Sequence, residues 1–165
     1  MSIVFHYEAF AGVGVVSREL CHRGAVQLGY LERDPLARGL MKRLFPEAAE
    51  AAEFDDGEFL GWDPPPAGGV VAASAGFPCT GISASGKQGF EHDPSTDYSL
   101  RFIDFGRAVG ASLLLGENVP QLFRGDRNYA LQEGAVHGLW SRLCDYASQE
   151  NYVLAGSAFI KDCGN

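Results

Sequence analysis

The stretch IVFHYEAFAGVGVV, residues 3–16, decides the fold of this chain. Residues 3–10 form a mainly apolar run that predicts a buried strand, and a glycine-rich turn follows it directly. Beyond the turn, Val16 and Leu20 stand four residues apart and share one face of an expected helix, which Gly24 ends. A strand, a glycine-rich turn and a helix in this order are typical of α/β sheets.

Alternating strands and helices continue along the chain. A helix is expected to begin with Asp34 as its N-cap and Pro35 in its first turn. Leu36, Leu40 and Leu44 are expected to share one face of that helix. Strands separated by helices predict an α/β fold, with a mostly parallel sheet, helices on both faces and ligands beyond the carboxyl ends of the strands. The other expected elements are strands at 25–32, 68–76, 111–119 and 152–159 and helices at 99–109 and 131–149.

Composition limits the class of protein. The 165 residues suit one domain, and the formal net charge of −8 argues against a nucleic-acid surface, because phosphate contacts need basic side chains. No apolar run approaches the ~20 residues of a membrane span, and the N-terminus lacks the basic region of a secretory signal. The four cysteines have no metal-ligand spacing, so we expect reduced thiols, no metal and a cytoplasmic location.

Two features at the ends of the first two expected strands point to a nucleotide-like ligand. Gly12 and Gly14 would let the backbone approach a ligand closely, although simple turn chemistry explains such a pair equally well. Glu32 ends the second strand, where an acid can bind ribose hydroxyls. The alternatives for Glu32 are a solvated carboxylate or a pair with Arg33. Together these features favour an adenosyl or dinucleotide ligand, and the incomplete glycine pattern disfavours a nicotinamide cofactor.

Two later loops carry reactive groups. In SAGFPCTGISASGKQGF, residues 74–90, Cys79 follows a proline in a run of small and polar residues, which suits a thiol that is presented to a substrate. In GENVPQ, Glu117 follows an apolar run and precedes Asn118. A half-desolvated carboxylate at a strand end is suited to act as an acid near neutral pH, and the alternative is a loop or N-cap acid without a role.

These loops resemble, in order and spacing, the motifs of the C5-cytosine DNA methyltransferases. EAFAGVG is similar to the family's first motif, and Glu32 with Asp34 to its second. GFPCTGISASGKQGF resembles its catalytic PC loop, and GENVP its ENV motif. The resemblance runs through nearly all of the chain. It implies a Rossmann-like, S-adenosylmethionine-dependent methyltransferase fold, with residues 1–165 as its catalytic, cofactor-binding domain.

The resemblance also implies a mechanism. Adding the Cys79 thiolate to C6 of cytosine would make C5 nucleophilic enough to attack the methyl group of S-adenosylmethionine. Glu117 would hydrogen-bond or protonate N3 of the base. Asn118 would hold the loop, and Ser83 would contact the DNA backbone. The implied partner is double-stranded DNA with a flipped cytosine.

The implied cofactor is S-adenosylmethionine, with S-adenosylhomocysteine as its product. Glu32 would bind the ribose hydroxyls, and Asp55 the adenine amino group, where Asp56 fits almost as well. For Phe10 and Leu100 the alternative is plain core packing. The remaining residues expected to line the cofactor are Phe10, Gly12, Gly14, Pro78 and Leu100.

The chain departs from the family pattern in several places. Glu8 stands where an aspartate is usual, Val15 replaces a second glycine, and Thr80 and Ile82 replace a glutamine and a phenylalanine. The sequence stops at AFIKDCGN, where the family continues into an arginine-containing segment, a target-recognition domain and a closing helix. The catalytic domain is therefore expected to be truncated, with weak or absent DNA binding and a complementary C-terminal polypeptide as a further partner.

Three functions stay open at this point. The first is the catalytic part of a DNA cytosine-5 methyltransferase, inactive alone. The second is a non-catalytic methyltransferase fold that binds a cofactor or a partner protein. The third is methylation of a tRNA cytosine, which one branch of the family performs.

Overall fold

The computed structural model describes residues 2–53, 58–78, 98–117, 146–150 and 152. The chain divides into two compact units, Met1–Pro78 with Tyr98–Glu117 and Cys79–Asp97 with Asn118–Asn165. In the second unit, residues 146–149 are helical. The elements of the first unit are β1 (Val4–Ala9), α1 (Val15–His22), β2 (Val26–Leu31), α2 (Pro35–Leu44), β3 (Ala49–Ala51), η1 (Glu58–Gly61), β4 (Val70–Gly76), α3 (Tyr98–Ala108) and β5 (Leu113–Glu117).

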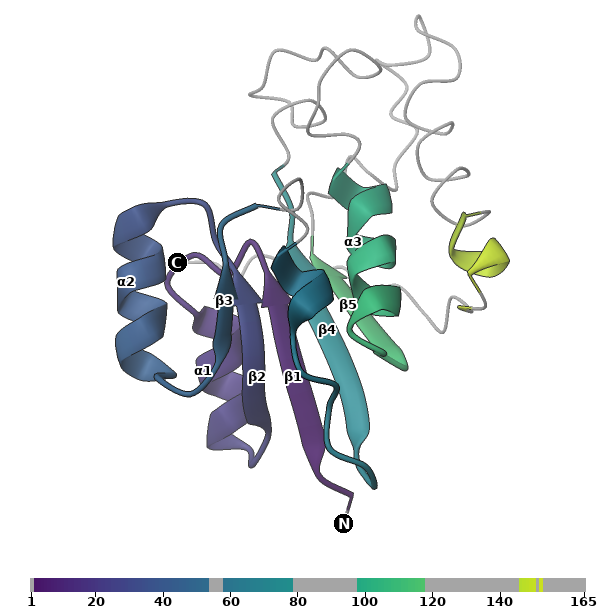
Figure 1. The fold of residues 1–165 in the computed structure, drawn as a ribbon, viewed down its shortest axis with the longest axis horizontal. Helices are drawn as coiled ribbons and strands as arrows, with labels where there is room; N and C mark the ends of the chain where they lie inside the picture. Colours follow the sequence, from purple (N-terminus) through teal and green to yellow (C-terminus); the bar gives the residue numbers. More distant parts are fainter. Residues whose placement is uncertain (1, 54–57, 79–97, 118–145, 151, 153–165) are drawn as a thin grey trace, which may run out of the picture. The chain divides into compact units, whose positions relative to one another are not determined.

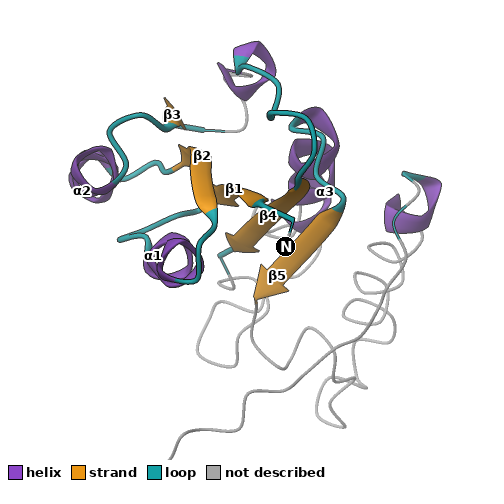
Figure 2. Ribbon diagram, turned by 90° about the horizontal axis from the view of Figure 1, so that it is seen from below, coloured by secondary structure: helices purple, strands orange, loops and turns teal. Residues whose placement is uncertain are grey.

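The first unit is built on a five-stranded sheet in the order β3-β2-β1-β4-β5 (Figure 1). Every neighbouring pair of strands is parallel. Helices α1 and α2 lie on one face of the sheet, and α3 and η1 lie on the other (Figure 2). The predicted α/β fold with a parallel sheet and helices on both faces is therefore confirmed.

The face toward α3 and η1 is packed with aromatic rings. Tyr7 of β1 stacks on Trp62 with ring centroids 5.8 Å apart. Phe59 meets Trp62 and Phe105 edge to face at 6.4 and 5.3 Å. Gly29 makes room for this cluster, because a Cβ there would lie 2.6 Å from the Trp62 ring. The short β3 and η1, which the sequence did not predict, complete this side of the fold.

The face toward α1 is polar where it meets β1. His6 is fully buried, and its Nδ1 lies 2.7 Å from Gln27 Oε1. Gln27 Nε2 donates to the carbonyl of Gly29, so its Oε1 faces the ring and Nδ1 carries the proton. Nε2 of His6 then accepts from the Ser74 hydroxyl at 2.8 Å. This neutral form agrees with the direction in which burial shifts the His6 pKa, below its usual value.

The apolar residues that share a face in the first two helices are not the ones that the fold buries most deeply. In α1 the buried side chain is Ser17, whereas Val16 is 41 % exposed and Leu20 is half-buried. The cause is the strand beneath, which presents a polar side chain to this helix and favours a hydrogen-bonding partner.

In α2, Met41 is fully buried against Ala11 and Tyr30, whereas Leu36 is 84 % exposed and Leu44 39 %. Leu40 is half-buried. The cap was predicted correctly, since Asp34 Oδ1 accepts from the amides of the second and third helical residues, both at 2.8 Å.

Other expectations are tested over the described residues alone. None of the helices there is long and apolar enough to cross a membrane. Cys21, the one cysteine among them, is a free thiol as expected. The expected helix 131–149 lies outside the described residues except at 146–149, and the expected strand 152–159 lies outside them except at its first residue.

Candidate functional site

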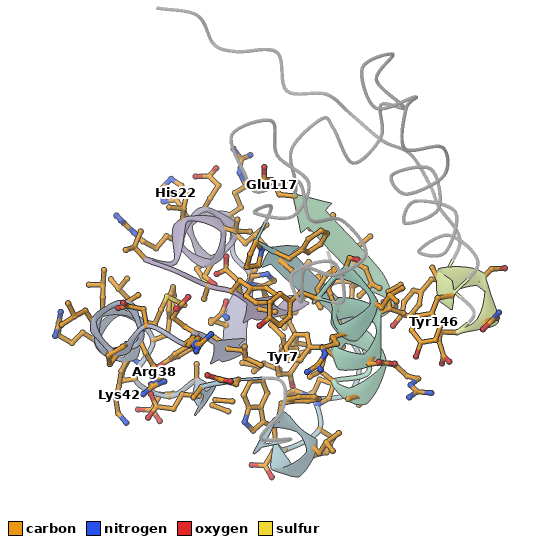
Figure 3. All side chains as sticks on the ribbon, turned by 90° about the horizontal axis from the view of Figure 1, so that it is seen from above. Tyr7, His22, Arg38, Lys42, Glu117 and Tyr146 are labelled. Carbon is orange, nitrogen blue, oxygen red and sulfur yellow. The ribbon has the colours of Figure 1, made fainter. Side chains whose placement is uncertain are left out.

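The loops singled out in the sequence begin at one edge of the sheet. Ala9 at the end of β1 pairs with Leu31 of β2 and with Ala75 of β4, and Gly76 pairs with Glu117 of β5. Figure 3 looks onto this edge and shows Glu117 at the end of β5. The chain leaves β1 toward α1 on one face, whereas the next helix after β4, α3, covers the other face. Such a divergence between neighbouring parallel strands is where α/β sheets bind ligands.

The loop after β1 has an unusual backbone. Phe10, Gly12 and Gly14 have φ angles of 54°, 52° and 74°, all in the left-handed region. Gly14 is the N-cap of α1, and a Cβ at this position would collide with the sulfur of Met41. Around Gly12 a Cβ would meet open space. The loop therefore needs glycine at position 14 for packing and conformation, and it leaves the backbone at position 12 approachable.

Glu32 holds this loop in place. The residue is 9 % exposed, and its Oε2 accepts from the amide of Gly12 at 2.6 Å while its Oε1 accepts from the amide of Asp34 at 2.6 Å. The glycine loop is thereby joined to the start of α2. Each carboxylate oxygen keeps a second lone pair that can accept a ligand hydroxyl.

Arg33 does not pair with Glu32. Its Nε lies 3.1 Å from Oε1 of Glu53, and both side chains are largely exposed. The interpretation of Glu32 as a partner of Arg33 is therefore wrong, as is that of a solvated carboxylate, because Glu32 is buried.

Glu8 is a second buried acid beside the loop, and the sequence reading did not give it a role. It is 4 % exposed, and one carboxylate oxygen, Oε2, accepts from both the amide and the hydroxyl of Ser17 in the first turn of α1. Gly14 offers no side chain to cap this helix, so Glu8 caps it from the neighbouring strand. Burial raises the Glu8 pKa to about 7, and the charge of Glu32 adds to the rise, against the bonds from Ser17. A charged residue inside an otherwise apolar strand was the signal for this role.

The structure describes the surroundings of four other predicted site residues. Phe10 meets Tyr98, the first residue of α3, edge to face with centroids 5.1 Å apart. Leu100 on α3 and Pro78 after β4 are both half-buried. Glu117 is exposed, so the desolvation expected for its carboxyl is not found. A Cβ built on Gly76 would lie 3.4 Å from Glu117 Oε2, which places this carboxyl over the end of β4.

The remaining predicted site residues lie outside the residues that the structure describes. They are Cys79, Asp55, the alternative Asp56, Ser83 and Asn118. The sheet edge thus brings together the predicted cofactor residues near β1 and β2 with Pro78 and Glu117. The roles of the reactive cysteine and of the DNA-contacting residues stay predictions.

Comparison with known proteins gives a fold and no more. No protein-family model matches the chain, and no curated protein matches its sequence. A candidate DNA modification methyltransferase encoded within an E. coli prophage superposes with a TM-score of 0.60 at 20% identity, over 88% of this chain and 38% of its own. A variant of DNMT2 from Spodoptera frugiperda superposes with a TM-score of 0.51 at 17% identity, over 89% of this chain and 41% of its own.

The chain therefore spans about two fifths of each of these two structures. The likeness to both structures confirms the Rossmann-like fold that the sequence predicted. The ends of β1, β2, β4 and β5, after which the predicted site loops begin, lie at the carboxyl edge of the sheet.

Proposed function

We propose that this chain is the S-adenosylmethionine-binding, catalytic part of a cytosine-5 methyltransferase that acts on DNA. The observation that carries the proposal is the glycine loop after β1, clamped through the amide of Gly12 by the buried carboxylate of Glu32. The loop leaves β1 where β1 and β4 diverge, the usual ligand position in such sheets, and the clamp joins it to the residue that follows β2. The order of the PC loop and the ENV segment in the sequence supports the reaction class.

The residues at this edge suit an adenosyl ligand. Glu32 keeps free lone pairs for ribose hydroxyls, and the open space around Gly12 lets a ligand approach the backbone. Phe10, Gly14, Pro78 and Leu100 would line the same site, with Asp55 at the adenine amino group. S-adenosylmethionine would supply an electrophilic methyl group. Two buried acids, Glu8 and Glu32, stand nearby and would favour such a cationic ligand.

The protein's own part in the chemistry would rest on two side chains. Cys79 would attack C6 of the cytosine ring as a thiolate, which requires its pKa to fall below the usual value of about 8.5. Glu117 would hydrogen-bond or protonate N3 of the ring as the thiolate adds, which makes C6 more electrophilic. Its exposed position at the end of β5 leaves the carboxyl open to an incoming base. After C5 has taken the methyl group, loss of the C5 proton and elimination of the thiolate would free the methylated base and Cys79. Asn118 and Ser83 would hold the loop and the DNA backbone.

The proposed substrate is a cytosine flipped out of double-stranded DNA. The chain is acidic, with a formal charge of −8, so its own surface adds little to phosphate binding. A complementary polypeptide would supply the basic, sequence-reading surface. There are two alternative functions. The chain would act on a tRNA cytosine, or it would bind the cofactor without catalysing a reaction.

The first test is calorimetric titration of the chain with S-adenosylhomocysteine. We expect a micromolar Kd, which corresponds to a binding free energy of about −8 kcal/mol. Glu32→Ala should weaken it at least about tenfold, because both the loop clamp and the ribose contact are lost. Glu19→Gln is the matched control, since Glu19 is an exposed acid of α1 whose contact is the surface pair with Arg23. No binding by the wild-type chain would overturn the proposed cofactor site.

The second test concerns Cys79. Duplex DNA that carries 5-fluorocytosine should trap a covalent adduct in the presence of S-adenosylmethionine when the chain is combined with a complementary C-terminal polypeptide, and Cys79→Ala should abolish the adduct. A tRNA oligonucleotide that carries 5-fluorocytosine is tested in parallel. An adduct on tRNA alone would favour the tRNA substrate. Cofactor binding without any adduct would favour the non-catalytic module.

A further inference from the structure

Phe10 has a backbone conformation that needs an explanation. Its φ of 54° lies in the left-handed region, and it is the one residue other than glycine to do so within the described ranges. A side chain with a Cβ is disfavoured there, and such residues persist when their surroundings hold them in place. The neighbours are fixed, since Ala9 and Ala11 are buried and the amide of Ala11 donates to Leu31 O at 3.1 Å. The strained residue thus sits inside a well-anchored loop.

Tyr98 contacts the ring of Phe10. The two rings meet edge to face, with centroids 5.1 Å apart and planes inclined by 66°. Tyr98 begins α3, which covers the face of the sheet opposite α1 (Figure 2). The aromatic pair therefore bridges the divergence between β1 and β4 and joins the glycine loop to the helix that carries Leu100.

We propose that Tyr98 is a positioning residue for the adenosyl ligand, which orients the ring of Phe10 as one wall of the site. This rests on the proposed function, because it requires an adenosyl ligand at this edge. An adenosyl group presents a flat heteroaromatic surface, and a fixed aromatic wall contacts it at little cost in conformational entropy. The ring of Tyr98, rather than its hydroxyl, performs this role, since the ring makes the contact with Phe10.

The test compares two substitutions at one position. Tyr98→Leu removes the ring and keeps most of the bulk, whereas Tyr98→Phe keeps the ring. Phe59→Leu is the matched control, because it removes a ring of η1 that contacts Trp62 and Phe105 edge to face in the aromatic core. Each variant is titrated with S-adenosylhomocysteine. The ring carbons of Phe10 are followed by NMR in selectively ¹³C-phenylalanine-labelled chain, with Phe10→Leu to assign the signal.

We expect Tyr98→Leu to weaken binding roughly three- to tenfold, the range for loss of one edge-to-face contact. In the ligand-free chain, Tyr98→Leu should also shift the Phe10 ring signal toward its random-coil value. Tyr98→Phe should retain both properties, and Phe59→Leu should lower the melting temperature without changing the affinity.

Three results would overturn the inference. Unchanged affinity in Tyr98→Leu, while the wild-type chain binds, would refute Tyr98 and leave the proposed function standing. An unchanged Phe10 signal in Tyr98→Leu would refute the positioning role whether or not the ligand binds. A wild-type chain that binds no S-adenosylhomocysteine would refute the proposed function together with the ligand role of Tyr98.

Discussion

Replacing Glu8 by glutamine should stabilise the chain at neutral and alkaline pH. The carboxyl of Glu8 is 4 % exposed, and its pKa rises from 4.5 to about 7, chiefly through burial. Between these two pH values the folded state holds a proton that the unfolded state has released. The free energy of unfolding therefore falls as pH rises from 4.5 toward 7 and is then level.

The size of this effect follows from the gap between the two pKa values. At about 1.4 kcal/mol per pH unit, the rise from 4.5 to about 7 corresponds to about 3 kcal/mol of lost stability. Glutamine does not ionise and can still accept from the amide of Ser17. Glu8→Gln should thus match the wild-type chain near pH 4.5 and exceed it by up to about 3 kcal/mol near pH 8.

The assay is urea unfolding of both chains across this pH range, with the free energy taken by linear extrapolation. His6 contributes to each chain with the opposite sign, because burial lowers its pKa, so that stability rises with pH up to its unfolded value. The difference between the two chains removes this contribution. Glu19→Gln, an exposed acid of α1, should change stability by less than about 0.5 kcal/mol at any pH. Parallel curves for Glu8→Gln and wild type would refute the reasoning.

Two further predictions concern the backbone near the site. Gly14→Ala should lower the free energy of unfolding by more than about 2 kcal/mol, because a left-handed residue gains a Cβ that collides with Met41. Gly12→Ala, whose Cβ would lie in open space, should lower it by about 1 kcal/mol. Equal melting temperatures for the two variants would contradict the described loop. Asp34→Ala should lower the free energy of unfolding by about 1 kcal/mol, because it removes the cap of α2. Asp34→Asn should stay close to wild type in the same urea titration. An Asp34→Ala variant as stable as the wild type would show that the cap contributes nothing.

The four longer strands could be predicted because each is a mainly apolar run bounded by turn residues. β3 was not predicted because Ala49–Ala51 is three residues long and has a glutamate at its centre. η1 was not predicted because its four residues are too few to show a hydrophobic periodicity. The positions of α1, α2 and α3 were predicted correctly, whereas most of the expected helix 131–149 lies outside the described residues. The leucines and valines that share a face did not reveal which residues α1 and α2 bury. A leucine or valine period assumes an apolar surface beneath, and β1 instead offers Glu8 to α1, which makes Ser17 the buried residue.

The candidate site divides in the same way. Glu32 was predictable from its place at the end of a strand, because chain position alone puts such a residue at the carboxyl edge. Its bond to the amide of Gly12 was not predictable, since the two residues meet only through the tertiary approach of two loops twenty positions apart. The contact of Phe10 with Tyr98 is of the same kind, and nothing local in the sequence marks residue 98 as part of the site.

The features that oppose stability gather at one edge of the sheet. The buried carboxyls of Glu8 and Glu32 and the left-handed backbone of Phe10 all lie in or beside the connection from β1 to α1. The opposite face is an ordinary aromatic core around Phe105. Natural proteins keep such unfavourable groups where function needs them, because stabilising replacements are otherwise easily found. Substitutions in the aromatic core should therefore lower stability with little effect on ligand affinity, whereas Glu8→Gln, at the edge, should raise stability and lower affinity for a cationic ligand. Such an opposition would support the proposed functional site at this edge on physical grounds that are independent of the sequence resemblance.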